Sequence, residues 1–166
     1  MKPSTSGRLQ YAEGYASLGM FSDAVVELSK IELSDIGFPE VLEAWMHIRY
    51  CQERWPSLLE LSTRYRMIFP KRREGWINLA FATRRIKGVS EAKAVLLQAE
   101  SLLGGADPLI LYNLACYHAQ CGELDFARRR LECAIALQPE MRDAAMRDDD
   151  LVELREEIAQ RSDSTS

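Results

Sequence analysis

The sequence feature that most constrains the fold is an internal repeat with a period of 34 or 35 residues. Arg8, Leu42, Trp76 and Leu111 open four similar stretches, and successive members of this series lie 34, 34 and 35 residues apart. Each stretch holds two runs with the apolar spacing of an amphipathic helix, separated by a short turn. Self-similarity with such a period indicates a stack of helix-turn-helix units, because one unit cannot bury its apolar face alone.

Residue types at equivalent positions of the four copies support this register. Small residues recur where the two helices of a hairpin must approach closely, and large residues fill the space beside and between hairpins. A glycine lies at or beside the turn in three copies. The shared positions, copy by copy, are Arg8, Tyr11, Ala12, Tyr15, Ala24, Leu28 and Ile31; Leu42, Trp45, Met46, Arg49, Leu58, Ser62 and Tyr65; Trp76, Leu79, Ala80, Thr83, Ala92, Leu96 and Ala99; Leu111, Leu114, Ala115, His118, Ala127, Leu131 and Ala134.

The second copy departs from this pattern. Met46 and Leu58 replace the two small residues, and Ser62 replaces a large one. We interpret this as an exchange of volume within one hairpin.

Helix starts are indicated by capping residues and prolines. Ser22, Ser90 and Asp125 fall at one repeat position and are predicted to be N-caps of the second helices. Pro39 and Pro108 are predicted to open first helices, because proline is tolerated in the first turn.

These offsets resemble the tetratricopeptide repeat, a 34-residue helix-turn-helix with the pattern W-x2-L-G-x2-Y, then A-x3-F, A and P. The resemblance covers about residues 5–140. It implies an all-α solenoid of about four hairpins with a C-terminal capping helix. The expected repeats are about 5–38, 39–72, 73–107 and 108–141, within an array over 7–140.

The two ends of the chain are expected to differ from the array. A capping helix over 142–161 would bury a stripe of Leu151, Leu154 and Ile158, with the acidic run 148–150 at its N-terminus. The Ser/Thr-rich segments 1–6 and 162–166 are predicted to be disordered.

Composition argues against several classes of function. A net charge of −4 disfavours nucleic acid as a partner. The N-terminus lacks an apolar leader and no later stretch is long and apolar enough to span a bilayer, so a cytoplasmic location is predicted. The four cysteines lack paired C-x2-C spacing, and we expect reduced thiols and no metal. No catalytic or phosphate-loop motif occurs, so neither an enzyme nor a cofactor is expected.

The resemblance also implies a ligand site. In tetratricopeptide arrays, certain positions of the first helices line a concave groove, where exposed aromatic residues are typical of an interaction site. An alternative is that these aromatics pack on one another or on the capping helix. The groove residues carried over to this chain are Leu9, Glu13, Glu43, His47, Tyr50, Ile77, Asn78, Phe81, Arg84, Arg85, Tyr112, Asn113 and Cys116.

Charge is distributed unevenly along this groove. Glu13 and Glu43 lie in the N-terminal half, whereas Arg84 and Arg85 lie in the third copy, so we expect an amphipathic peptide with charges of both signs. The carboxylate clamp of tetratricopeptide domains that bind heat-shock proteins is disfavoured, because Asn78 alone fits its residue pattern.

The predicted function is an adaptor or scaffold that binds a polypeptide segment in the groove. One alternative is a small tetratricopeptide chaperone for a secreted or membrane-inserting partner. Another is a regulatory RNA-binding or enzyme-associated subunit that uses the basic third repeat. Homodimerisation through an exposed end of the array also remains open.

Overall fold

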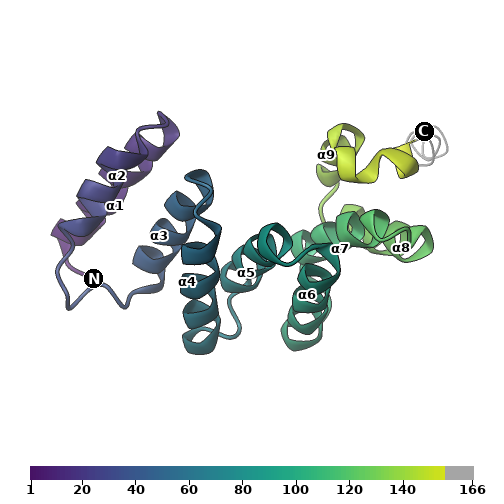
Figure 1. Cartoon of the computed structure of the whole chain (residues 1–166), viewed down its shortest axis with the longest axis horizontal. Helices are drawn as coiled ribbons and strands as arrows, with labels where there is room; N and C mark the ends of the chain where they lie inside the picture. The colour runs from purple at the N-terminus through teal and green to yellow at the C-terminus, as the bar shows by residue number, and fades with distance from the viewer. Residues whose placement is uncertain (156–166) are drawn as a thin grey trace. The chain divides into compact units, whose positions relative to one another are not determined.

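The computed structural model describes residues 1–155, which contain helices and no strand. Most of the helices form consecutive pairs joined by short turns (Figure 1). The elements are α1 (Pro3–Ser17), α2 (Phe21–Ser29), α3 (Pro39–Cys51), α4 (Trp55–Ile68), α5 (Arg73–Ile86), α6 (Val89–Leu103), α7 (Pro108–Gln120), α8 (Leu124–Leu137), α9 (Met141–Arg147) and the 3-10 helix η1 (Asp149–Leu154).

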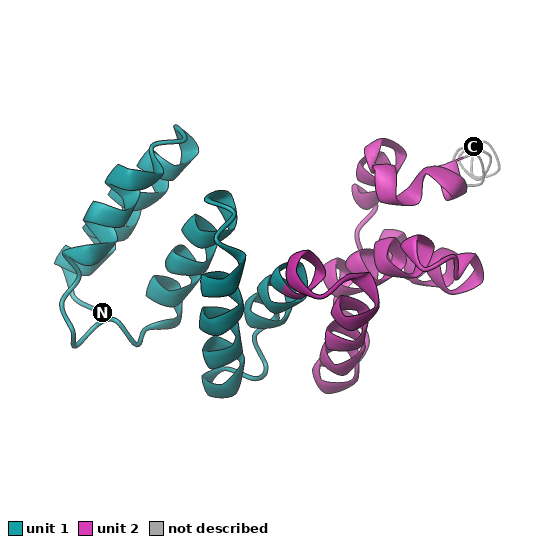
Figure 2. Cartoon of the chain, in the orientation of Figure 1, with its two compact units in different colours: residues 1–82 teal, residues 83–166 magenta. Residues whose placement is uncertain are grey.

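The chain divides into two compact units, residues 1–82 and 83–166, coloured separately in Figure 2. The boundary falls within α5. The first unit contains the first two helix pairs, and the second contains α6 to η1.

The core of the first pair forms where the small residues of the repeat bring its helices together. Ala12 of α1 and Ala24 of α2 are buried, and α1 also contacts α3. Both alanines belong to one apolar cluster with Leu28, Val41 and Ile48. The repeat pattern predicted that small residues at these positions allow the two helices of a hairpin to pack closely, and this prediction is confirmed for the first pair.

The second pair accommodates its larger residues by an exchange of volume. Met46, Leu58 and Ser62 are all fully buried, and the first two cluster with Tyr65 and Ala82. The Ser62 hydroxyl donates to the Leu58 carbonyl at 2.6 Å, so this buried polar group needs no partner from another helix.

In the second unit, α7 is the most buried helix. Leu114 and Ala115 are fully buried, and α7 contacts both α6 and α8. Leu111 forms a further cluster with Ala134 of α8 and Met141 of α9.

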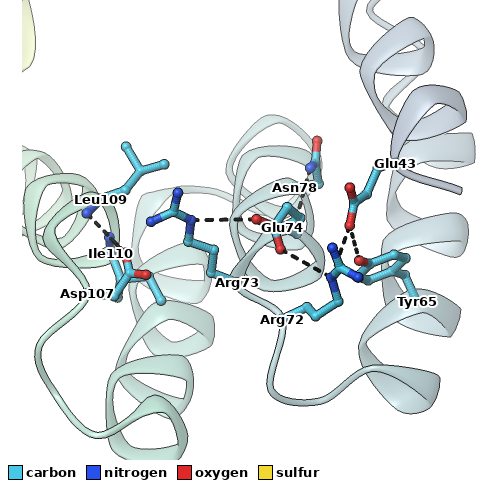
Figure 3. A network of polar contacts seen from close by, with 9 residues as sticks. All are labelled: Glu43, Tyr65, Arg72, Arg73, Glu74, Asn78, Asp107, Leu109 and Ile110. Carbon is cyan, nitrogen blue, oxygen red and sulfur yellow. Dashed lines mark hydrogen bonds and ion pairs between the residues drawn. The ribbon is translucent and has the colours of Figure 1, made fainter. Parts of the chain in front are cut away.

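The predicted N-caps of the second helices are wrong. Ser22, Ser90 and Asp125 lie in the first turns of α2, α6 and α8, whose N-cap residues make no side-chain capping bond. Helix α7 does have an aspartate cap, Asp107, whose Oδ1 accepts from the Leu109 and Ile110 amides at 3.0 and 3.1 Å (Figure 3). Pro39 and Pro108 open α3 and α7 as predicted.

The N-terminal segment differs from the expected disorder over residues 1–6. Helix α1 begins at Pro3, and Thr5 is buried. The Thr5 hydroxyl and the Lys2 amide both donate to Asp35 Oδ2, at 2.7 and 2.8 Å. The composition of residues 1–6 could not reveal these hydrogen bonds, because the acceptor, Asp35, lies in the loop after α2.

The C-terminal element also differs from the single capping helix expected over 142–161. Helix α9 ends at Arg147, Asp148 is extended (φ −85°, ψ 118°), and η1 follows. The helix breaks there because the Asp148 carboxylate accepts from the Asp150 amide. Leu151 and Leu154 are buried as predicted. Ile158 and the predicted tail 162–166 lie outside the described residues.

Candidate functional site

A pocket of about 510 Å³ lies along α1 and α3 in the first unit. It includes four of the predicted groove residues, Leu9 and Glu13 of α1 and Glu43 and His47 of α3. The remaining lining residues, most of them small or acidic, are Ala12, Ala16, Ser17, Glu40, Ala44 and Ile48. The predicted inner positions of these first helices therefore do enclose a space.

A second pocket, of about 340 Å³, adjoins the first and shares Glu43 and His47 with it. Its other lining residues are Tyr50, Glu74, Asn78 and Phe81. The two pockets thus follow the inner positions of α1, α3 and the first part of α5.

Aromatic side chains form the wall of the second pocket. The Tyr50 ring lies 5.4 Å from the Phe81 ring and 5.7 Å, edge-on, from the Trp55 ring. Tyr50 nevertheless remains 40% exposed. These aromatics pack on one another, and part of the Tyr50 side chain stays accessible to solvent.

A polar network positions Glu43 at the junction of the two pockets (Figure 3). The Tyr65 hydroxyl donates to Glu43 Oε1, and Arg72 Nε lies 3.3 Å from the same oxygen. Burial, and then this hydrogen bond to the carboxylate, raise the pKa of Tyr65 above its usual range. These two contacts therefore fix the orientation of the Glu43 carboxylate.

Glu74 continues this network at the far side of the second pocket. Arg72 Nε lies 4.0 Å and Arg73 Nε 3.6 Å from its carboxylate. Both contacts are drawn as dashed lines in Figure 3. The Asn78 amide donates to the Glu74 carbonyl at 2.9 Å. We did not include Glu74 among the predicted groove residues. The repeat register could have identified it, because Glu74 lies 34 residues after Glu40, another lining residue.

The predicted groove residues of the second unit have a different environment, because the segment after α9 covers them. The Tyr112 hydroxyl donates to Asp148 Oδ2 at 2.9 Å, and Cys116 Sγ lies 3.6 Å from the same oxygen. Arg84 forms a two-pronged ion pair with Asp150, at 2.8 and 3.1 Å. Burial, and then the Asp148 charge, raise the pKa of the Cys116 thiol.

The other predicted residues lie outside both pockets. Ile77 is buried, and the Asn113 amide is directed to the Leu109 carbonyl at 2.8 Å. Arg85 is exposed. Apart from the buried Ile77 and the exposed Arg85, the predicted list separates into a part that lines the pockets in residues 1–82 and a part around α7 that the protein itself covers.

Three possible metal-ligating groups converge beside α7. The Cys116 sulfur and carboxylate oxygens of Asp148 and Asp150 lie within 4.8 Å of one another. Arg84 already supplies a positive charge to Asp150, and Tyr112 donates to Asp148. The contacts account for this cluster as an ion-paired network, so its geometry gives no reason to place a cation there.

Two arginines of α8 are paired with carboxylates. On α8, Arg128 lies 2.7 Å from Asp125, and Arg130 lies 2.9 Å from Glu100 of α6.

Within residues 1–155, no helix has both the length and the apolar character needed to cross a bilayer.

Comparisons with known proteins find similarity at the level of structure. No protein-family model and no curated protein matches the sequence. The crystal structure of TTC0263, a thermophilic TPR protein of Thermus thermophilus, matches with a TM-score of 0.74 and 21% identity over 93% of this chain and 86% of that one. The crystal structure of MamA protein matches with a TM-score of 0.67 and 19% identity over 96% and 88% of the two chains.

Proposed function

Because the chain has the tetratricopeptide repeat fold, as its residue pattern predicted, we propose that it is an interaction scaffold that binds a polypeptide segment along residues 1–82. Binding would take place in the two adjoining pockets. We define these pockets, with the Tyr50 and Phe81 rings at one end and Leu9 at the other, as the first-unit groove.

The observation that carries the proposal is the continuity of the first-unit groove. Two pockets share Glu43 and His47, and their lining includes seven of the thirteen groove residues that the repeat register predicted. An extended segment could therefore contact both without a break. Exposed aromatic surface beside oriented polar groups is the composition of a binding site rather than of a solvated face.

The charge of the groove indicates the chemistry of the ligand. The lining carboxylates Glu13 and Glu40 are exposed, whereas Glu43 and Glu74 already have arginine partners. Arg84, which we expected to contribute the opposite charge, instead pairs with Asp150 in the second unit. The ligand of this groove is therefore a segment with lysine or arginine near an apolar side chain, rather than one with charges of both signs.

The contacts of the basic third repeat favour a protein ligand over RNA. Three arginines of this repeat, Arg72, Arg73 and Arg84, each pair with a carboxylate. Phosphate contacts would need these ion pairs to be broken.

The proposal is tested by selecting ligands from a displayed library of random nine-residue peptides on the full-length protein. Selected peptides should be enriched in lysine or arginine next to an apolar residue. Affinity of one such peptide is then measured by fluorescence polarisation. Tyr50→Ala combined with Phe81→Ala should weaken binding by at least tenfold, because aromatic anchors carry much of the energy of an interface.

Two double variants with the same change in net charge test whether peptide binding depends on charges in the groove or on the charge of the whole protein. Glu13→Lys with Glu40→Lys changes the groove, whereas Glu60→Lys with Glu140→Lys makes the same charge change at exposed positions outside it. Only the first pair should abolish binding. Equal loss in both pairs, or selected peptides that bind the Tyr50→Ala, Phe81→Ala protein normally, would contradict the proposal.

A further inference from the structure

The segment after α9 contacts α7 through side chains rather than through helix packing alone. Asp148 accepts from Tyr112, and Asp150 receives the paired nitrogens of Arg84 as well as the Gln120 amide. These contacts join residues that are far apart in the chain, 66 positions in the case of Arg84 and Asp150.

Apolar side chains complete the contact. Leu151 and Leu154 of η1 are 0% and 1% exposed, and η1 lies against α7 and α8. The two aspartates and two leucines give the segment a simple pattern, Asp-x-Asp-Leu-x-x-Leu, in which every named residue is half-buried or buried. We refer to Tyr112, Cys116 and Gln120 of α7, together with Arg84 from the end of α5, as the α7 face.

The α7 face consists of donors that suit an acidic ligand. Arg84 presents a guanidinium, Tyr112 a hydroxyl and Gln120 an amide, and all three are directed to carboxylates. A two-pronged guanidinium–carboxylate pair is specific for the planar geometry of the carboxylate. The Asp148 carbonyl is also fixed, because Arg155 donates to it at 3.1 Å.

We propose that the α7 face is a second binding surface, for an acidic peptide of the pattern Asp-x-Asp-Leu-x-x-Leu, and that residues 148–154 occupy it in cis. This surface is independent of the first-unit groove and takes a ligand of opposite charge. Residues 148–154 reduce the fraction of molecules that can accept such a peptide from another protein, and the apparent affinity falls by the same factor.

The polar nature of the contact makes the segment displaceable. Its backbone is extended at Asp148, and the short 3-10 segment that follows is kinked at Leu151. A competing peptide needs to replace the Arg84–Asp150 ion pair, the hydrogen bonds from Tyr112 and Gln120, and two leucines. Cys116 lies beneath Asp148 and is 4% exposed, which makes its thiol a reporter of displacement.

The test uses the full chain and a fluorescently labelled peptide of residues 146–155, MRDDDLVELR. Wild-type protein is compared with Asp148→Ala, Asp150→Ala protein, in which the donors of the α7 face lose their intramolecular partners. The variant should bind the peptide at least tenfold more tightly than wild type. Adding Arg84→Ala should abolish this gain, whereas adding Lys87→Ala, which removes a nearby exposed cation, should leave it unchanged.

A second variant guards against misfolding, since Asp148 also caps η1. Asp148→Asn with Asp150→Asn keeps the shape of both side chains and should give the same order of affinities. The rate at which a maleimide labels Cys116, located by peptide mass mapping, should rise at least tenfold in either variant. Labelling of the exposed Cys133 provides the control and should not change.

Three results would overturn the proposal. The first is equal peptide affinity in wild type and in a folded aspartate variant. The second is tighter binding that Arg84→Ala does not affect. The third is a wild-type dimer in sedimentation that Arg84→Ala dissociates, because the occupant would then be the segment of a second copy rather than the chain's own.

Discussion

Glu53 occupies the turn position that glycine holds in the first and fourth hairpins. Its φ is +55°, close to the +73° of Gly19 and the +74° of Gly122. Glu53 lies 34 residues after Gly19 and 69 residues before Gly122, which is the spacing of the repeat. The positive φ therefore follows from the position in the repeat and not from the residue type. A side chain in this left-handed region is strained, because its Cβ approaches the following carbonyl.

Exchanging residue types at this turn position should change stability in opposite directions. Glu53→Gly is expected to raise the free energy of unfolding by about 0.5–1 kcal/mol, since relief of strain exceeds the added entropy of the unfolded chain. Gly19→Ala should lower it by about 1 kcal/mol, although a Cβ there meets no atom within 4 Å. Urea unfolding of both variants measures the effect. A loss of stability in Glu53→Gly would show that the glutamate side chain makes a compensating contact.

At the scale of the element, the N-terminal helix depends on one buried carboxylate. The Lys2 amide, and then the Thr5 hydroxyl, hold the pKa of Asp35 below its ordinary value. Because the pKa is lower in the folded than in the unfolded chain, the ionised carboxylate stabilises the protein above the unfolded value of about 3.9. That stabilisation is lost as the pH falls through the folded pKa.

This linkage predicts how a substitution in the loop before α3 behaves with pH. Asp35→Asn should lower the melting temperature at pH 7, and the difference from wild type should shrink as the pH falls below about 4. Thermal melts followed by circular dichroism from pH 7 to pH 2 test this. Thr5→Val, which removes one donor, should reduce the pH dependence of wild type without removing it. Parallel curves for wild type and Asp35→Asn would exclude the proposed role of the carboxylate.

At the scale of the whole molecule, stability is expected to be local. Within each unit, helices contact their neighbours along the chain, as α2 does with α1 and α3, and α7 with α6 and α8. In repeat arrays of this kind, stability is approximately a sum of repeat and nearest-neighbour terms. A destabilising substitution in one unit should then lower the stability of that unit and leave the other unchanged.

Hydrogen exchange can test this locality with a pair of equivalent substitutions. Leu28→Ala and Leu131→Ala each remove a buried leucine at the same repeat position, at a cost of about 2–5 kcal/mol. The first should accelerate exchange in α1 to α3 and leave α7 and α8 unchanged, and the second should do the reverse. Equal acceleration in every helix would indicate that the chain unfolds as one cooperative unit.

The sequence by itself determined the helix pairs and the inner positions of the first helices. Ala12, Ala24, Ala115 and Ala127 are buried because a small residue at a fixed repeat offset is required wherever two helices meet. This requirement acts within one hairpin, and the residue pattern of that hairpin is therefore sufficient to reveal it. The N-caps were predicted less well, because the second helices begin two residues earlier than the polar residues suggested and have no side-chain cap.

Only the tertiary structure decided which inner positions remain open to a ligand. Glu43 and Tyr50 line pockets, whereas Tyr112 and Cys116, at the same repeat positions as Glu43 and His47, are covered by the segment that begins at Asp148. The physical reason is that covering depends on a break in the C-terminal helix and on ion pairs between distant residues. Helical periodicity specifies the face of each helix, but it does not specify which distant segment will contact that face.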